Sequence, residues 1–172
     1  MTAAPSCSTS SSSTPTRRAD ALRIFIDADA CPVKEEIYKV ARRYRLPVSV
    51  VANAYIMVPR EPLIESVVVD AGPDVADDWI AERATAADVV VTQDIPLADR
   101  CLKSGATVLN SKGVPFTEGS IGMALAGRAI GEHLRSMGEI TRGPAPFSAT
   151  DRSRFLQALD EAVNRIKRRQ GG

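Results

Sequence analysis

Five short apolar runs, separated by longer segments with other patterns, constrain the fold of this chain more than any other feature of its sequence. Their apolar and β-branched residues predict strands at residues 22–26, 48–52, 66–69, 88–92 and 106–109. Strands that are almost wholly apolar are typical of a parallel sheet that is buried on both faces. We therefore expect an α/β fold in which a parallel sheet lies between two layers of helices.

Segments with helical spacing or a proline at their start follow four of these five runs. They predict helices at residues 32–46, 73–84, 95–104 and 118–137. The second and third strands are joined instead by a loop that contains Pro59 and Pro62. A rigid connector at residues 143–146 precedes a last helix, which begins at a Ser148/Thr150 cap, so two helices follow the sheet.

The composition allows one domain and excludes several classes of protein. With 172 residues, of which 44% are hydrophobic, the chain can bury one core. We place this domain at residues 21–168, after a disordered Ser/Thr-rich lead at 1–20 and before a frayed tail at 169–172. A net charge of +1 excludes a protein that coats nucleic acid through bulk charge. No apolar run approaches the roughly 18 residues of a membrane span.

Cysteine and histidine usage favours a cytoplasmic protein without zinc. The three cysteines form no C-x-x-C pair, so the sequence predicts neither a disulfide framework nor a zinc site. The single His133 has no partner that would make it part of a zinc hydrolase or a Cys/His nucleophile.

Two aspartates stand at the end of the first predicted strand. Asp27 and Asp29 are two positions apart, so an extended chain turns both carboxylates to the same side, where they can share one hard cation. The alternative is a turn followed by a helix cap, and it applies more to Asp29 than to Asp27.

Three more aspartates stand at the start of the helix that follows the third strand. Asp74, Asp77 and Asp78 have the spacing that places all three carboxylates on one face of the first turn. Acids also favour a helix N-terminus for reasons of the helix dipole alone. We expect Asp78 to be the one that is plain helix surface.

One further aspartate follows the fourth predicted strand directly. Asp94 lies near Asp27 if the first and fourth strands are neighbours, as they are at the switch point of a doubly wound sheet. We expect Asp99, about one turn further along the next helix, to lie on the surface.

Acids from three strand ends predict a site of oxygen ligands without histidine or cysteine, which suits Mg²⁺ or Mn²⁺. The candidate metal ligands are Asp27, Asp29, Asp74, Asp77 and Asp94, with Asp27 and Asp94 as the candidate catalytic residues. Such a site favours metal-assisted hydrolysis of a phosphodiester, because a bound metal lowers the pKa of the attacking water. An initial Asp-x-Asp also fits a phosphatase with an Asp nucleophile, but we identify no Lys and further acids in the context that such an enzyme needs.

Basic residues near these segments are candidates for binding the phosphates of a nucleic acid. Lys34 follows the first acids, Arg128 lies on helix 118–137, and Arg152 and Arg154 follow the proline-rich connector. The alternative for each is ordinary solubilising charge. The aromatic residues are expected to be packing groups rather than a platform for RNA bases; they are Tyr38, Tyr44, Tyr55 and Trp79.

Four ordered motifs resemble the YaiI/YqxD family of uncharacterised bacterial proteins. They lie at residues 27–34 (DADACPVK), 74–80 (DVADDWI), 91–98 (VTQDIPLA), and 143–147 (GPAPF) followed by 151–155 (DRSRF). The likeness runs from about residue 22 to 166. The family is similar to PIN-like and NYN-like domains, and this resemblance implies a nuclease fold whose metal acids are Asp27, Asp74 or Asp77, and Asp94.

Two positions depart from these patterns. Many NYN-like sites carry a second aspartate two residues after Asp94, where this chain has Pro96, and Arg142 replaces a common glycine. The leading hypothesis is therefore a Mg²⁺- or Mn²⁺-dependent nuclease acting on RNA or another nucleic acid. The alternative is a PIN-like module that binds nucleic acid or a ribonucleoprotein partner without cleaving it.

Overall fold

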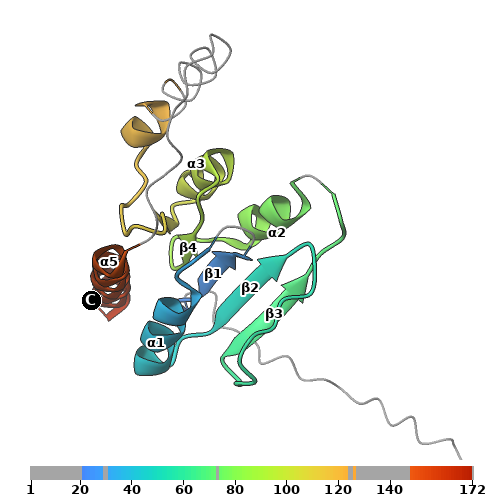
Figure 1. The fold of residues 1–172 in the computed structure, drawn as a ribbon. Coiled ribbons are helices and arrows are strands. Elements are labelled where there is room, and N and C mark those ends of the chain that lie inside the picture. Colours follow the sequence, from blue (N-terminus) through green and yellow to red (C-terminus); the bar gives the residue numbers. More distant parts are fainter. Residues whose placement is uncertain (1–20, 29–30, 73, 124–125, 127–147, 172) are drawn as a thin grey trace, which may run out of the picture.

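The computed structural model describes residues 21–28, 31–72, 74–123, 126 and 148–171. Its elements alternate between strands and helices along the chain (Figure 1). In order they are β1 (Ile24–Asp27), α1 (Lys34–Tyr44), β2 (Val48–Ala52), β3 (Ile64–Val68), α2 (Val75–Arg83), β4 (Val89–Val91), α3 (Ile95–Lys103), β5 (Thr107–Leu109) and α5 (Ala149–Gly171).

The five strands form one parallel sheet in the order β3-β2-β1-β4-β5. The chain therefore moves outward from β1 to β3 and then returns to the other side of β1. As a result β1 lies between β2 and β4, with Ile26 opposite Val91. The predicted adjacency of the first and fourth strands is confirmed, and the crevice beyond their carboxyl ends is where ligands bind in sheets of this kind.

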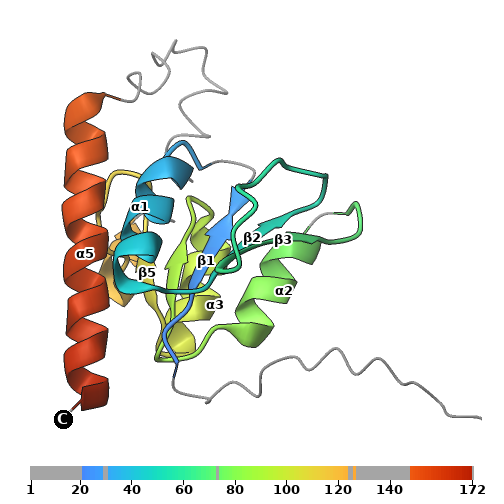
Figure 2. The same ribbon diagram turned by 90° about the horizontal axis from the view of Figure 1, so that it is seen from below.

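Helices cover both faces of the sheet, as predicted. Figures 1 and 2 show α1 and α5 on one face and α2 and α3 on the other. Alternate strand residues supply the two cores: Ile24 and Ile26 pack toward α1 and α5, whereas Phe25 packs toward α2 and α3. The molecule is thus a three-layer α/β fold, and the side of the sheet that each β1 residue faces is fixed by its position in the strand.

The packing of α1 against α5 explains why the chain continues after the sheet. The side chains of α1 that are buried include Ile37 and Val40, and α5 contributes Phe155, Leu159 and Val163 to the same core. In effect α5 covers a face that α1 alone would leave open to solvent, and burial of each such side chain is worth roughly 1.5–3 kcal/mol.

Several boundaries differ from those expected. The third strand begins at Ile64 rather than at residue 66, and it includes Glu65, which lies opposite Ser49 of β2 and accepts a hydrogen bond from the Ser49 hydroxyl at 2.6 Å. The last helix runs to Gly171, through most of the segment expected to be a frayed tail. Residues 118–123 are helical as predicted, but the rest of helix 118–137 except residue 126, the 143–146 connector and the 1–20 lead lie outside the described residues. No helix in the described ranges is long and apolar enough to cross a bilayer.

Candidate functional site

A hydroxyl group joins the ends of the two central strands. Asp27 is the last residue of β1 and lies on the same side of the sheet as Phe25, the side of α2 and α3. Its exposed fraction is only 9%. Thr92, which follows β4 and is itself buried, donates a hydrogen bond from Oγ1 to Asp27 Oδ2 at 3.0 Å. The pairing of β1 with β4 thus places a carboxylate and a hydroxyl together at the carboxyl edge.

The same hydroxyl group reaches the second predicted catalytic residue. The backbone N–H of Asp94 donates to Thr92 Oγ1 at 3.0 Å. The Asp94 carboxylate caps α3 by accepting the N–H of Leu97 at Oδ1, also at 3.0 Å. Thr92 therefore bridges Asp27 and Asp94, so these residues from different strands open onto one edge of the sheet.

The start of α2 brings two more carboxylates toward this edge. Asp74 is the N-cap residue of α2 in a left-handed conformation, with a φ of 65°, and its side chain makes no capping hydrogen bond. Asp77, in the first turn, has a pKa raised to about 6 by burial and by the negative charges of Asp94, Asp27 and Asp74, while Arg100 lowers it. The charges of Asp94, Asp27 and Asp74 thus all act on the Asp77 carboxylate. We call Asp27, Asp74, Asp77 and Asp94 the acidic edge.

Two neighbouring aspartates face away from the acidic edge. Asp78 is exposed and forms an ion pair with Arg100 at 2.6 Å, which agrees with its expected place on the helix surface. Asp99 pairs with Lys103 at 2.7 Å along α3 and is also partly exposed. The charge of each of these two aspartates is therefore paired with a cation on a helix surface.

The acidic edge is not assembled into a coordination sphere. In the part of the chain that the structure describes, no three Asp, Glu, His or Cys side chains form a group that could hold a metal ion. The predicted ligand Asp29 lies outside the described residues. Burial raises the pKa of the nearby Cys31 thiol to about 11, so this cysteine is not a thiolate nucleophile at neutral pH.

The predicted basic residues occupy different environments. Lys34, the first residue of α1, lowers the pKa of Cys31 while Asp27 raises it, so both charges lie near that thiol. Arg154 is exposed on α5. Arg152 instead pairs with the buried carboxylate of Glu36 on α1, at 3.3 Å, and so contributes to the packing of α5 against α1. Arg128 lies outside the described residues.

Lys112, in the loop after β5, is a cation at the carboxyl edge of the sheet that the sequence analysis did not identify. The Gln93 amide donates to Ser111 Oγ at 2.5 Å, and this contact ties the loop after β4 to the loop after β5. Lys112 follows Ser111 in a turn held by Asn110, whose side-chain oxygen accepts the N–H groups of Lys112 and Val114. Its position directly after a strand was the signal that could have identified it, because every such loop opens onto the carboxyl edge.

Three of the four aromatic residues expected to be packing groups are so. Tyr38 is buried, Trp79 makes an edge-to-face contact with Phe25 at 6.0 Å between ring centres, and Tyr44 donates a hydrogen bond to Asp160. Tyr55 is different, because 79% of it is exposed. The packing role predicted for Tyr55 is therefore wrong.

Comparison with known proteins identifies the family. A family model described as "Uncharacterized BCR, YaiI/YqxD family" matches residues 25–165. The chain belongs to the YaiI/YqxD family. The matched segment includes the sheet from Phe25 onward and all four residues of the acidic edge.

Proteins of several bacteria are closely similar over most of their length. A UPF0178 protein of Caulobacter sp. (strain K31) is 64% identical over 145 residues, which are 84% of this chain and 96% of that protein. UPF0178 proteins of Rhodopseudomonas palustris (strain ATCC BAA-98 / CGA009) and Bradyrhizobium diazoefficiens are each 61% identical, over 88% and 86% of this chain and over 96% and 89% of their own lengths. No solved structure matches the chain.

Proposed function

We propose that the acidic edge is the active site of a divalent-metal-dependent nuclease that hydrolyses phosphodiester bonds, with RNA as its substrate. The observation that carries the proposal is the Thr92 hydroxyl group that joins Asp27 and Asp94 at the carboxyl ends of β1 and β4. Burial raises the pKa of Asp77, and the negative charges of Asp94, Asp27 and Asp74 add to this rise. A fold that gathers four carboxylates at one place incurs electrostatic repulsion, and a dication removes that repulsion.

The chemistry of the donor groups fits a hard cation. The acidic edge offers carboxylate oxygens, with the Thr92 hydroxyl beside them and no thiolate or imidazole among its four members, and such donors suit Mg²⁺ or Mn²⁺ rather than zinc. To hold the ion, Asp27, Asp77 and Asp94 would have to draw closer together, because no three such side chains of the described residues are grouped to do so; Asp74 and Asp29 are further candidates. When bound, the metal would lower the pKa of a water molecule and polarise the phosphate.

The residues of the chain have separate tasks in this proposal. Thr92 fixes the orientation of Asp27 through its hydrogen bond. The Asp27 carboxylate is therefore already ordered before the substrate binds. Lys34 supplies positive charge near Asp27, since both charges act on the Cys31 thiol, and Lys112, which lies near Asp151, supplies it from the loop after β5. A phosphodiester at the site needs such counter-charge in addition to the metal. Arg154 extends this charge along α5, whereas the proposed phosphate-binding role of Arg152 competes with its ion pair to Glu36.

A cleavage assay tests the proposal. Labelled single- and double-stranded RNA and DNA are incubated with the purified protein and Mg²⁺ or Mn²⁺, with EDTA as the metal-free control. We expect RNA cleavage that requires the metal, is lost in Asp27→Asn and is kept in Asp99→Asn, whose carboxylate is already paired with Lys103. Absence of cleavage of every substrate with both metals would contradict the proposal.

The second candidate function is a PIN-like module that binds nucleic acid or a ribonucleoprotein without cleaving it. Two observations favour it. Within the described ranges no three acidic side chains are grouped to hold an ion, and Pro96 occupies the position where NYN-like sites carry a further aspartate. In this case RNA binding that is sensitive to salt would be retained in Asp94→Asn, and neither form would cleave RNA.

A further inference from the structure

The connection between β2 and β3 is the only crossover of the described sheet that contains no helix, and an extended loop takes its place at residues 53–63. Alternate side chains of this loop point in opposite directions. Ile56 and Val58 pack against the core that β1 shares with α1 and α5. By contrast, Tyr55, which precedes Ile56, is 79% exposed, and Met57, which lies between Ile56 and Val58, is 85% exposed. The period of two along an extended chain accounts for this alternation.

The exposure of these two side chains is not explained by the fold. Ile56 and Val58 suffice to anchor the loop, and polar residues would serve equally well at the outward positions. Single exposed apolar residues are common on protein surfaces. Here, however, a large aromatic ring and a flexible thioether stand two positions apart on the same side of one loop, which is a surface that a flat apolar ligand can contact.

The loop borders an open hollow of about 590 Å³ on the protein surface. Its lining includes Tyr55, Met57, Pro59 and Arg60. This volume lies within the range of about 300–1,000 Å³ that is usual for small-ligand sites. The hollow can therefore accept a group the size of a nucleobase beside the Tyr55 ring.

The charge of this loop favours an anionic ligand. Glu61 is the acid among the residues that line the hollow, and Arg42 neutralises it through hydrogen bonds from Nε and Nη2. Arg60 forms no ion pair with any residue in the described ranges. The hollow therefore combines an aromatic ring with a net positive charge.

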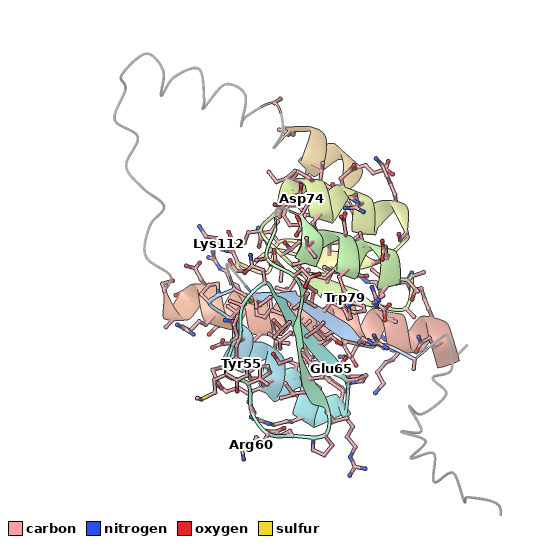
Figure 3. The ribbon with its side chains drawn as sticks, turned by 90° about the vertical axis from the view of Figure 1, so that its right-hand side faces the viewer. Tyr55, Arg60, Glu65, Asp74, Trp79 and Lys112 are labelled. Carbon is pink, nitrogen blue, oxygen red and sulfur yellow. The ribbon has the colours of Figure 1, made fainter. Side chains whose placement is uncertain are left out.

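The loop begins at the carboxyl end of β2, on the side of the sheet where the residues of the acidic edge lie. Val51 of β2 lies opposite Asp27 in the parallel register, and Tyr55 follows only four residues later. In Figure 3, Tyr55 lies in the lower half of the molecule, between Arg60 below it and Lys112 above it, and Asp74 of the acidic edge lies near the top. A nucleic-acid strand that contacts Tyr55 would therefore have to run past the carboxyl end of β2 to reach the acidic edge.

We infer that loop 53–63 is a binding site for an unpaired nucleobase, which stacks on Tyr55 while Arg60 contacts an adjacent phosphate. The substrate class is therefore single-stranded nucleic acid. A duplex cannot use this site, because its bases are stacked on one another and their faces are not available to the ring. This inference rests on the proposed function, since it names the substrate of the same edge.

The test measures binding without cleavage. Fluorescence anisotropy in EDTA gives the affinity for a labelled single-stranded RNA, the DNA of the same sequence, and the matching duplexes. The variants are Tyr55→Ala, Tyr55→Phe and, as the matched control, Met123→Ala, which removes a residue that is 78% exposed elsewhere on the surface. Thermal unfolding confirms that each variant is folded.

We expect Tyr55→Ala to weaken binding of the single strand about tenfold, the loss typical of one stacked base. Tyr55→Phe and Met123→Ala should bind as wild type does, and the duplex should bind more weakly and ignore Tyr55. Equal loss for single strand and duplex, no loss, or no binding of either would overturn the inference. So would a sedimentation experiment in which wild type is a dimer and Tyr55→Ala a monomer, because the loop would then be an interface between copies of the chain.

The outcomes separate the two proposals. If the protein cleaves nothing but shows this dependence on Tyr55, the nuclease proposal fails and the single-strand site stands. If it cleaves RNA through Asp27 and Tyr55→Ala leaves both affinity and strand preference unchanged, the nuclease proposal stands and the single-strand site fails.

Discussion

Thr92 Oγ1 lies 3.0 Å from Asp27 Oδ2, and the same oxygen accepts the backbone N–H of Asp94 at 3.0 Å. One hydroxyl group thus couples the ends of β1 and β4, which are far apart in sequence. Because Thr92 is only 2% exposed, water does not substitute easily for these two hydrogen bonds. The position of the Asp27 carboxylate therefore depends on Thr92 as well as on β1.

Replacement of Thr92 by valine removes both hydrogen bonds while keeping the shape of the side chain. We expect Thr92→Val to lower the free energy of unfolding by about 1–3 kcal/mol, because a buried carboxylate oxygen and a backbone N–H lose their partner. Urea denaturation measures this loss. Thr92→Ser keeps the hydroxyl group and should lose less, whereas an equal loss in both variants would assign the effect to packing of the methyl group.

The crowding at the acidic edge predicts a pH dependence of stability in metal-free buffer. The pKa of Asp77 is raised from its ordinary value of 3.8 to about 6, so the folded state holds this proton more tightly than the unfolded state does. The contribution of Asp77 to stability is therefore full below about pH 4 and falls as the pH rises through about 6. In Asp77→Asn this fall is absent.

The Asp77→Asn variant should thus gain stability relative to wild type as the pH rises from about 4 to 7. The gain should be about 1 kcal/mol, a figure that allows for the screening of a partly exposed group. Denaturant melts across this pH range, in EDTA, measure it. A difference between the two proteins that does not change with pH would contradict the raised pKa of Asp77, which burial and then the charges of Asp94, Asp27 and Asp74 cause.

The pair of Arg152 and Glu36 predicts a structural effect where the sequence suggested phosphate binding. Glu36 is 7% exposed, and among the described residues its Oε2 atom has no hydrogen-bond partner. Arg152→Ala removes the ion pair that neutralises this carboxylate, so we expect a loss of about 1–3 kcal/mol in stability. The exposed neighbour Arg154 gives the matched control, Arg154→Ala, which should change stability little.

A double-variant comparison separates the pair from its surroundings. In the Glu36→Gln background, Arg152→Ala should cost clearly less than in wild type, because no buried charge is left uncompensated. If the cost is the same in both backgrounds, Arg152 stabilises the protein through other contacts.

The turn that presents Lys112 depends on Gly113. This glycine has a φ of +81°, and a Cβ atom there would lie 2.8 Å from both the carbonyl oxygen of Arg154 and the Cα of Phe155. Gly113→Ala should therefore lower stability by about 1–3 kcal/mol and weaken RNA binding by moving Lys112. Gly122→Ala, where the added Cβ meets nothing within 4 Å, is the control. It should leave RNA binding unchanged and should not lower stability, because Gly122 lies in a helical segment where Ala is preferred over Gly. If the Gly113→Ala protein is as stable as wild type, the loop that contains Gly113 does not lie as close to α5 as the structure indicates.

The main features of the fold followed from the sequence because they depend on local patterns. Apolar runs determine where strands occur, and the general rule for doubly wound sheets correctly placed β1 beside β4. The convergence of Asp27 and Asp94 was predictable for the same reason. The early start of β3 was not predictable in this way, because Glu65 interrupts the apolar run and its partner Ser49 is brought opposite it only by the register of β2 and β3.

The features that were missed depend on contacts between distant segments. Arg152 looks like a solvated cation until α5 packs on α1 and places it against Glu36. Thr92 belongs to a predicted motif, but its hydroxyl acquires two partners only through the register of β1 and β4. Tyr55 was taken as a packing residue because aromatic residues usually are, and only the alternation within an extended loop turns it to solvent.

Titration with Mn²⁺ by calorimetry, on the protein without any substrate, tests the central claim most directly. The variants are Asp27→Asn and the control Asp99→Asn, which removes a carboxylate that already pairs with Lys103. We predict that wild type and Asp99→Asn bind Mn²⁺ alike, and that Asp27→Asn binds it far more weakly. Wild-type protein that takes up no Mn²⁺, or an Asp27→Asn variant that binds as tightly as wild type, would contradict a metal site at the acidic edge.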